Sequence, residues 1–139
     1  MNRRVLMDTG PLVAYFCADE ARHAWSVQQF TAFAIPVLTC EAVLAETCFL
    51  MARQGMPAWR LLEMVERGVM RVAFDLQAEA PAIRQMMKRY GDRPMSLADA
   101  CLVRLAETHD LPICTLDSDF EVYRKHGRER LPLIIPRES

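Results

Sequence analysis

The chain has 139 residues, of which 52% are hydrophobic and 25% charged, and its formal net charge is −1. This length suits one domain whose hydrophobic core folds without disulfides or a structural metal. The near-zero charge excludes a global field that attracts nucleic acid or an acidic membrane, so any polyanion must be met by a local patch.

Short apolar runs alternate with helical patterns along the chain. In chain order we expect a strand over 5–8, a helix opened by Pro11, a helix over 19–33, a strand over 35–39, helices over 40–55 and 57–67, a strand over 69–74, helices over 76–90 and 96–109, a strand over 112–116, a short helix over 119–127 and a strand over 131–135. Most strands are continuously apolar, which is typical of a mainly parallel sheet covered on both faces. We therefore expect a single domain over 1–139 with an α/β fold, a three-layer α/β/α sandwich.

The cysteines and the start of the chain bear on the compartment. The five cysteines are odd in number and show no C-x-x-C spacing, which favours reduced, buried thiols. The apolar run before Asp8 is too short for a signal peptide, and no apolar run approaches membrane-spanning length. We expect a cytoplasmic protein without a membrane partner.

Four acidic residues occupy positions where a parallel sheet forms ligand sites. Asp8 and Asp117 directly follow expected strands, and ligands bind beyond the carboxyl ends of such strands. Glu46 lies in the middle of a helix, on a face shared with the apolar side chains three and four residues away. Asp99 lies in the first turn of a helix, where the helix dipole favours negative charge. These positions predict one acidic site.

Each acid also has a purely structural interpretation. Ser96–Asp99 matches the S-x-x-D capping box, and Asp8 before Thr-Gly suits a turn. Glu46 would pair with an arginine, and Asp117 or Asp119 would cap the next helix. Acids at two strand ends, one helix face and one helix start are hard to obtain from unrelated caps, so their conjunction favours function.

The residue types in this set favour one kind of chemistry. Carboxylates without histidine or thiolate partners are hard oxygen ligands that suit Mg²⁺ or Mn²⁺. The three histidines, His23, His109 and His126, are far apart in sequence, which argues against zinc. The chain contains no G-x-x-x-x-G-K-[ST], G-x-G-x-x-G or G-x-S-x-G motif. What remains is metal-assisted attack of water on a phosphodiester.

Four segments together resemble the four acidic motifs of the PIN domain family, in the family's order. They are VLMDTGPLVAYF, EAVLAETCFL, MSLADACLVRLAE and ICTLDSDF. The resemblance implies an α/β/α nuclease that binds Mg²⁺ or Mn²⁺ and cleaves RNA. It places the catalytic, metal-binding acids at Asp8, Glu46, Asp99 and Asp117, with Asp119 as an auxiliary ligand.

The resemblance extends to two hydroxyl residues and to a subfamily. Thr9 and Thr115 resemble the hydroxyl residues beside the acids, which orient water or a carboxylate; a plain strand-end role is the alternative. The small size is most similar to VapC-type toxins of prokaryotic toxin–antitoxin pairs. That likeness implies a cognate antitoxin and a homodimer, with apolar contacts from the helical faces that carry Trp25, Trp59 and Met64.

An RNA substrate requires cations near the site. Arg93 and Arg104 are the first candidates, and Lys88, Arg89 and the segment 123–130 are further ones. For each of them alone, a solvated charged face is an equally good interpretation.

Three other functions have partial sequence support. Asp-Thr-Gly at 8–10 resembles the aspartic-protease motif, but that chemistry pairs two copies in an all-β fold. Asp-Ser-Asp at 117–119 resembles a haloacid-dehalogenase-like phosphatase, whose nucleophile motif ends the first strand instead. A non-toxin PIN nuclease, or a PIN-like domain that binds RNA or protein without cleaving it, is the remaining alternative.

Overall fold

A computed structural model describes residues 3–137, and its centre is a five-stranded parallel sheet. The strand order is β3-β2-β1-β4-β7, and every neighbouring pair in it is parallel. The strands are β1 (Leu6–Met7), β2 (Val37–Thr39), β3 (Met70–Val72), β4 (Ile113–Cys114) and β7 (Leu133–Ile134).

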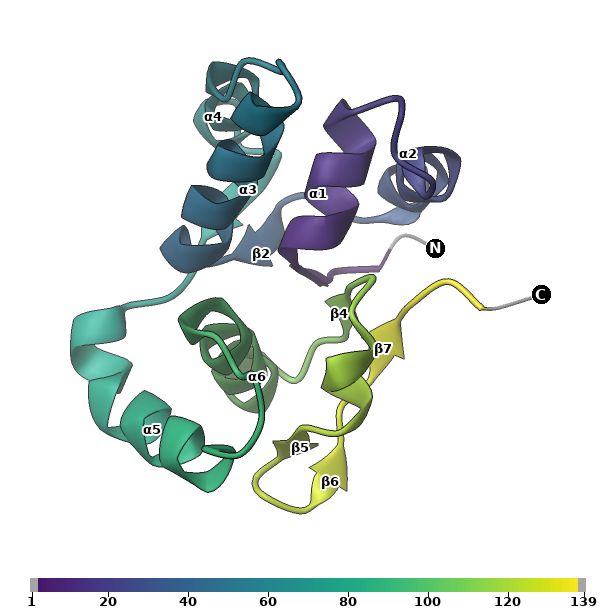
Figure 1. Cartoon of the computed structure of the whole chain (residues 1–139). Helices are drawn as coiled ribbons and strands as arrows, with labels where there is room; N and C mark the ends of the chain where they lie inside the picture. Colours follow the sequence, from purple (N-terminus) through teal and green to yellow (C-terminus); the bar gives the residue numbers. More distant parts are fainter. Residues whose placement is uncertain (1–2, 138–139) are drawn as a thin grey trace.

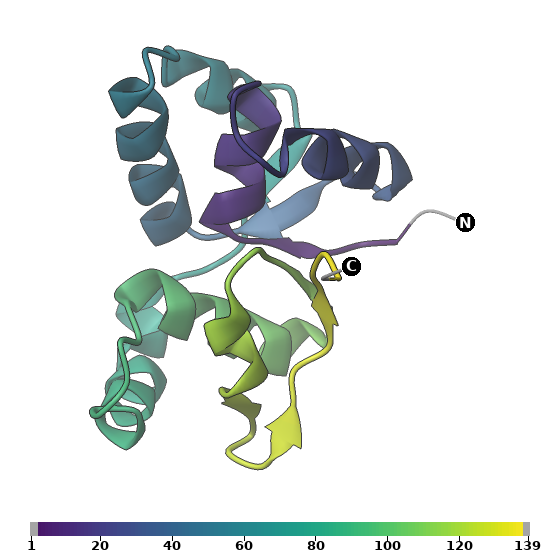
Figure 2. The same ribbon diagram turned by 45° about the vertical axis from the view of Figure 1, so that its right-hand side comes forward.

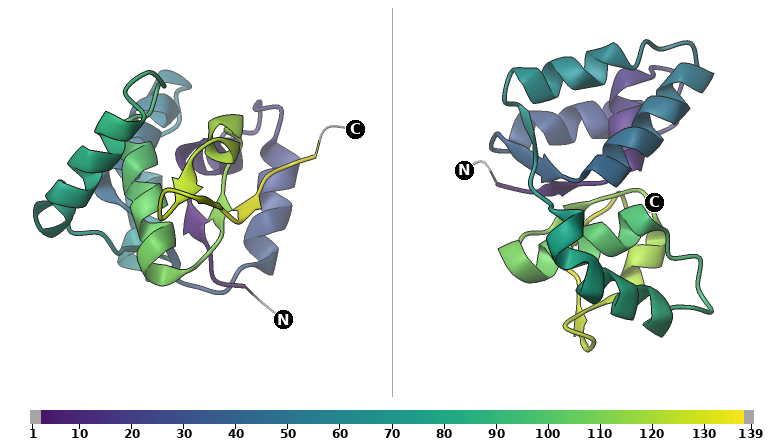
Figure 3. Two further views of the ribbon diagram at one scale, coloured as in Figure 1. Left: turned by 90° about the horizontal axis from the view of Figure 1, so that it is seen from below. Right: turned by 90° about the vertical axis from the view of Figure 1, so that its left-hand side faces the viewer.

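Helices cover both faces of this sheet (Figure 1). One face carries α1 (Thr9–Phe16), α2 (His23–Ala32), α3 (Glu41–Arg53) and α4 (Trp59–Glu66), and the other carries α5 (Leu76–Arg89), α6 (Leu97–His109) and the 3-10 helix η1 (Ser118–Glu121). Figures 2 and 3 show the same division from other sides. The expected α/β/α sandwich is confirmed. Within residues 3–137, no helix has both the length and the apolar character that crossing a membrane demands.

The burial of the strands explains why their sequences are continuously apolar. Every residue of β1, β2 and β4 is buried, since helices pack on both sides of these central strands. The edge strands β3 and β7 are only partly buried. The five cysteines are free thiols, as expected, and four of them are buried.

The expected helix over 119–127 is wrong beyond Glu121. The chain leaves η1 and forms an antiparallel hairpin of β5 (Arg124–Lys125) and β6 (Glu129–Arg130). At the turn, His126 and Gly127 have φ values of 54° and 75°. Glycine adopts such left-handed backbone without strain, so this turn ends the helical path and returns the chain as a hairpin.

Candidate active site

An open cleft of about 580 Å³ lies beyond the carboxyl ends of β1 and β4. We name it the carboxylate cleft, because four of the acids singled out in the sequence line it. They are Asp8, Glu46, Asp99 and Asp117. The structure thus brings together side chains from two strand ends and two helices, and Asp119 is not among the residues that line the cleft.

Asp8 is the least exposed of these four acids. It follows β1, is only 6% exposed, and accepts a 2.6 Å hydrogen bond at Oδ2 from Thr115 Oγ1. Burial raises the pKa of Asp8 from 3.8 to about 6; the Thr115 bond opposes this rise, while the charges of Asp99 and Asp117 add to it. Asp8 therefore changes charge close to neutral pH in the protein without metal.

Thr115 connects the ends of two strands through one hydroxyl group. Besides donating to Asp8, its Oγ1 accepts a 2.9 Å hydrogen bond from the backbone N–H of Asp117. Thr115 is fully buried. The position of Asp8 and the path of the chain into η1 are therefore fixed by the same atom.

Thr9 places a second hydroxyl at the cleft. Its side chain is 4% exposed, and Oγ1 has no hydrogen-bond partner among the described residues. Buried polar atoms in proteins are nearly always hydrogen-bonded, so this unpaired hydroxyl, buried beside the cleft that Thr9 lines, is a group that a bound water or ligand would satisfy.

Asp99 has both of the roles that the sequence left open. It forms a complete capping box at the start of α6, with Ser96 N donating to Asp99 Oδ2 and Asp99 N donating to Ser96 Oγ. Tyr123 donates a third hydrogen bond, of 3.2 Å, also to Oδ2. These bonds leave Oδ1 without a donor among the described residues. Burial raises the pKa of Asp99, and the bonds from Ser96 oppose that rise.

Tyr123 is a site residue that the sequence interpretation missed. It is buried, and its ring packs edge-on against Tyr90 and Phe120, at centroid distances of 5.1 and 5.5 Å. Burial and the nearby negative charge of Asp99 raise the pKa of the Tyr123 phenol. Nothing in the local sequence marks this tyrosine, because its contact with Asp99 is made across the tertiary structure.

Glu46 differs from its expected surroundings. It lies on an exposed part of α3 and lines the cleft next to Leu50, whereas Phe49 is 62% exposed. Its face is therefore only partly buried, since Val43 on it is in the core, and within residues 3–137 no ion pair with arginine holds Glu46. The Glu46 side chain can rotate toward a bound ion.

Asp117, not Asp119, is the cap of the helix that follows β4. Asp117 is the N-cap of η1, and its Oδ1 accepts a 2.9 Å hydrogen bond from the backbone N–H of Asp119. Asp117 is exposed and lines the cleft beside Ser118. Of the two candidates for the cap, Asp119 is excluded, because the cap precedes the helix and Asp119 lies inside it.

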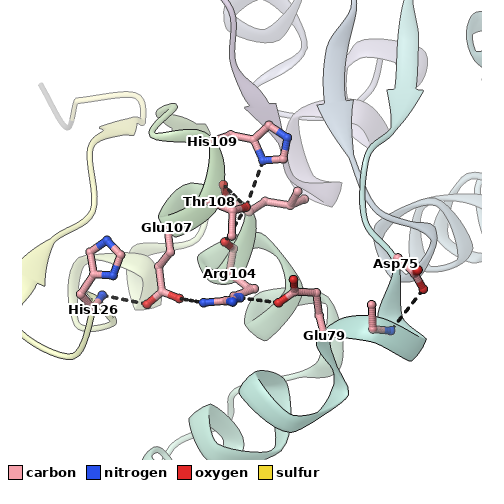
Figure 4. Close-up of polar contacts among 9 residues, drawn as sticks. Asp75, Glu79, Arg104, Glu107, Thr108, His109 and His126 are labelled. Carbon is pink, nitrogen blue, oxygen red and sulfur yellow. Dashed lines mark hydrogen bonds and ion pairs between the residues drawn. The ribbon is translucent and has the colours of Figure 1, made fainter.

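The two arginines expected near RNA lie in different places. Arg93 is exposed in the turn before α6, next to Pro94, which lines the carboxylate cleft. Arg104 points away from the cleft and pairs with Glu79 and Glu107, at 2.5 and 3.2 Å (Figure 4). Neither arginine lines the cleft, and Arg93 adjoins a residue that does.

The donor set of the cleft fits a hard divalent cation. Carboxylate and hydroxyl oxygens line it, without histidine or cysteine. Within residues 3–137, no three His, Cys, Asp or Glu side chains stand close enough together to hold an ion as they are. The unpartnered Thr9 hydroxyl, the free Asp99 Oδ1 and the exposed Glu46 carboxylate, which forms no ion pair among the described residues, are groups that a cation would engage.

The comparisons with known proteins agree with this geometry. The sequence model of the PIN domain family matches residues 5–126, which include all four acidic motifs. The chain belongs to the PIN domain family. Among solved structures, the crystal structure of VapC20 from Mycobacterium tuberculosis, a sarcin-ricin loop cleaving toxin, is similar to this PIN domain with a TM-score of 0.75. The two are 22% identical, over 85% of this chain and 93% of that chain, and so share a fold. No curated protein sequence matches the chain.

Proposed function

We propose that this PIN domain is a metal-dependent ribonuclease that hydrolyses phosphodiester bonds in RNA. The observation that carries the proposal is the gathering of four carboxylates, two of them buried, in one cleft at the carboxyl edge of the sheet. Membership of the PIN family and the similarity in fold to an RNA-cleaving toxin support it. The parallel sheet is incompatible with an all-β aspartic protease.

The proposed mechanism divides the work among the residues of the cleft. A Mg²⁺ or Mn²⁺ ion held by Asp8, Glu46, Asp99 and Asp117 would activate water and offset charge on the phosphate. Thr115 holds one oxygen of Asp8, and Ser96 and Tyr123 hold one oxygen of Asp99, so each buried carboxylate is oriented before substrate arrives. The Thr9 hydroxyl would orient a water or a phosphate oxygen, and Arg93, in the turn before Pro94, would contact the RNA backbone.

Cleavage of labelled RNA by the purified protein tests this function. We expect cleavage in Mn²⁺ or Mg²⁺ and none in chelator. Glu46→Gln should lower the rate by about 100-fold or more, since it removes a charge from an exposed side chain without disturbing packing. Glu41→Gln, an exposed acid on the same helix that does not line the cleft, should cleave like the wild type. Equal rates for the two variants would contradict the role of the carboxylate cleft.

We further propose that the protein acts in the cytoplasm as the toxin of a type II toxin–antitoxin pair. A groove of about 410 Å³ between α1 and α4 is lined by Trp59, Met64, Tyr15 and Phe16, and Trp59 is 59% exposed. This groove suits an apolar segment of an antitoxin, whereas Trp25 packs against the core instead. A homodimer is the other assembly that the VapC likeness suggests, and sedimentation of the purified protein measures it.

Growth of a bacterial host with inducible expression tests the toxin role. We expect the wild type to slow growth and Glu46→Gln to leave growth unchanged, since only the former cleaves RNA. Co-expression of the protein encoded beside this gene should restore growth. Harmless expression of an enzyme that cleaves RNA in vitro would instead indicate a non-toxin PIN nuclease.

A further inference from the structure

A second cavity, of about 210 Å³, lies between α5, α6 and the β5–β6 hairpin. It shares no lining residue with the carboxylate cleft. We name it the arginine cavity, because guanidinium groups from three separate parts of the chain line it, together with one imidazole. These residues are Arg89, Arg104, Arg124 and His126.

One of these arginines forms ion pairs with two acids. Arg104 pairs with Glu79 and Glu107, and Glu107 also accepts a 2.7 Å hydrogen bond from the backbone N–H of His126 (Figure 4). Glu107 is the one acid among the described residues that line the cavity. The network therefore ties α5, α6 and the hairpin turn together and forms a wall of the cavity.

The other two guanidinium groups keep their charge. Arg89 is exposed and has no acidic partner within residues 3–137. It lies against Gly127, where a β-carbon would overlap Nη1 of Arg89, so the glycine leaves the space that the guanidinium fills. Arg124 donates through Nη1 to three backbone carbonyls, which are neutral acceptors. Neither Arg89 nor Arg124 forms an ion pair with a described carboxylate, and the three arginines together with Glu79 and Glu107 leave one net positive charge at the cavity.

A chain of side-chain contacts connects the arginine cavity with the carboxylate cleft. Tyr90 lines the cavity and packs against Tyr123, whose hydroxyl group donates to Asp99. Arg104 follows Asp99 by five residues on α6, which is about 7.5 Å along the helix axis. Five residues also turn a helix by about 140°, so an RNA strand whose reacting phosphate lies in the cleft would follow the surface around α6 to reach the cavity.

We propose that the arginine cavity binds a backbone phosphate of the RNA strand whose scissile bond lies in the carboxylate cleft. This rests on the proposed ribonuclease function for the identity of the strand. Guanidinium groups match phosphate oxygens bidentately, and a small polar cavity with uncompensated positive charge favours a compact anion. Arg89 and Arg124 supply that charge, and the Glu79–Arg104–Glu107 network holds the walls.

Binding of RNA in chelator tests the proposal without catalysis. The Kd of a labelled 20-nucleotide single-stranded RNA is measured over a range of KCl concentrations. Arg89→Gln should weaken binding several-fold and reduce the slope of log Kd against log salt by about 0.7, the contribution of one phosphate contact in a single strand. Arg89→Lys, which keeps the charge, should restore most of the slope.

The control is Arg84→Gln, because Arg84 is an exposed arginine on α5 that lines a different surface from Arg89. It should bind RNA with the Kd and slope of the wild type. Melting temperatures establish that all variants are folded. If Arg89→Gln and Arg84→Gln give the same Kd and slope, the cavity does not hold a phosphate and the proposal is overturned.

Cleavage separates this proposal from the proposed function. With a dinucleotide, whose single phosphodiester would lie in the cleft and leave no phosphate for the cavity, Arg89→Gln should cleave like the wild type; with the 20-nucleotide RNA its KM should rise. Wild-type protein that binds RNA but fails to cleave it in Mn²⁺ would overturn the ribonuclease function and leave the phosphate site standing. If Arg89→Gln weakens binding of an acidic peptide but not of RNA, the cavity is a protein-binding site and the proposal fails.

Discussion

The hydroxyl group of Thr115 donates a 2.6 Å hydrogen bond to Oδ2 of Asp8, across the parallel pair of β4 and β1. The two residues are 107 positions apart in sequence. The bond holds a buried carboxylate at the edge of the sheet, and it uses the same oxygen that accepts from the N–H of Asp117. One hydroxyl therefore orients an acid of the cleft and supports the loop that carries another.

Replacing Thr115 by valine removes this bond with little change of shape. We expect Thr115→Val to lower the free energy of unfolding by about 1.5–3 kcal/mol, because the lost bond has a charged acceptor, and to weaken Mn²⁺ binding, because Asp8 loses its orientation. Denaturant unfolding and calorimetric titration measure the two effects. Thr39→Val is the control, since Thr39 is also fully buried but donates to the Met7 carbonyl. It should lose stability and keep its Mn²⁺ affinity, and an unchanged affinity in Thr115→Val would contradict the orienting role.

Asp8 makes the stability of the metal-free protein depend on pH. Its pKa is about 6 in the folded protein and 3.8 ordinarily, so between these values the folded state binds a proton that the unfolded state has released. The free energy of unfolding should therefore fall as pH rises from about 4 to 6. Above pH 6 the protein bears the full cost of keeping a charged Asp8 carboxylate buried. Asp8→Asn should remove it, raising stability by about 2–3 kcal/mol at pH 7.5 and by little at pH 3.5. Unfolding in chelator at both pH values measures this, and a gain of equal size at both would exclude titration of Asp8 as the cause.

The order of strands and helices could be predicted because continuous apolar runs encode central strands of a parallel sheet. The acids at 8 and 117 could be assigned to one edge because both follow such strands. The hairpin after Glu121 could not be predicted, since its turn depends on left-handed backbone at His126 and Gly127.

The parts of the site that the sequence did not predict are contacts made across the tertiary structure. Tyr123 reaches Asp99 through ring packing with Tyr90 and Phe120, and no local motif marks such a contact. For the same reason the sequence could not separate Arg104, which pairs with two acids, from Arg89, which does not. Residue type indicates which side chains suit a cation, and packing decides which of them line the cleft.

Metal binding should stabilise the fold. An ion that binds only the folded state stabilises it by about 2.7 kcal/mol at a hundredfold excess over Kd, and here it also relieves repulsion among the clustered carboxylates. We expect a higher melting temperature in saturating Mn²⁺ than in chelator. Glu46→Gln should show a smaller increase and Glu41→Gln the full one. An unchanged melting temperature in the wild type would count against a metal site in the carboxylate cleft.

Asp99 combines a capping box with a place in the cleft, and two substitutions separate these roles. Asp99→Asn keeps an oxygen acceptor for Ser96 N and the Tyr123 hydroxyl but loses the charge, so we expect a near-normal melting temperature and no cleavage. Ser96→Ala removes the cap and should cost about 1 kcal/mol of stability while cleavage persists. Thermal melts and cleavage rates measure both, and the opposite pattern would make Asp99 a cap alone.

The fourth acid of the cleft is tested by comparing Asp117 with Asp119. Asp117 caps η1 through its carboxylate and lines the cleft, so Asp117→Ala should lose about 1 kcal/mol of stability and reduce cleavage by orders of magnitude. Asp117→Asn retains the acceptor for the Asp119 N–H, and we expect it to separate the effects: stability near the wild type, with cleavage still lost. Asp119 contributes only its backbone N–H to the cap, so Asp119→Ala should leave stability and cleavage nearly unchanged. Melting curves and cleavage rates of the three variants, measured side by side, decide the assignment, because cleavage retained in Asp117→Asn but lost in Asp119→Ala would transfer the role to Asp119.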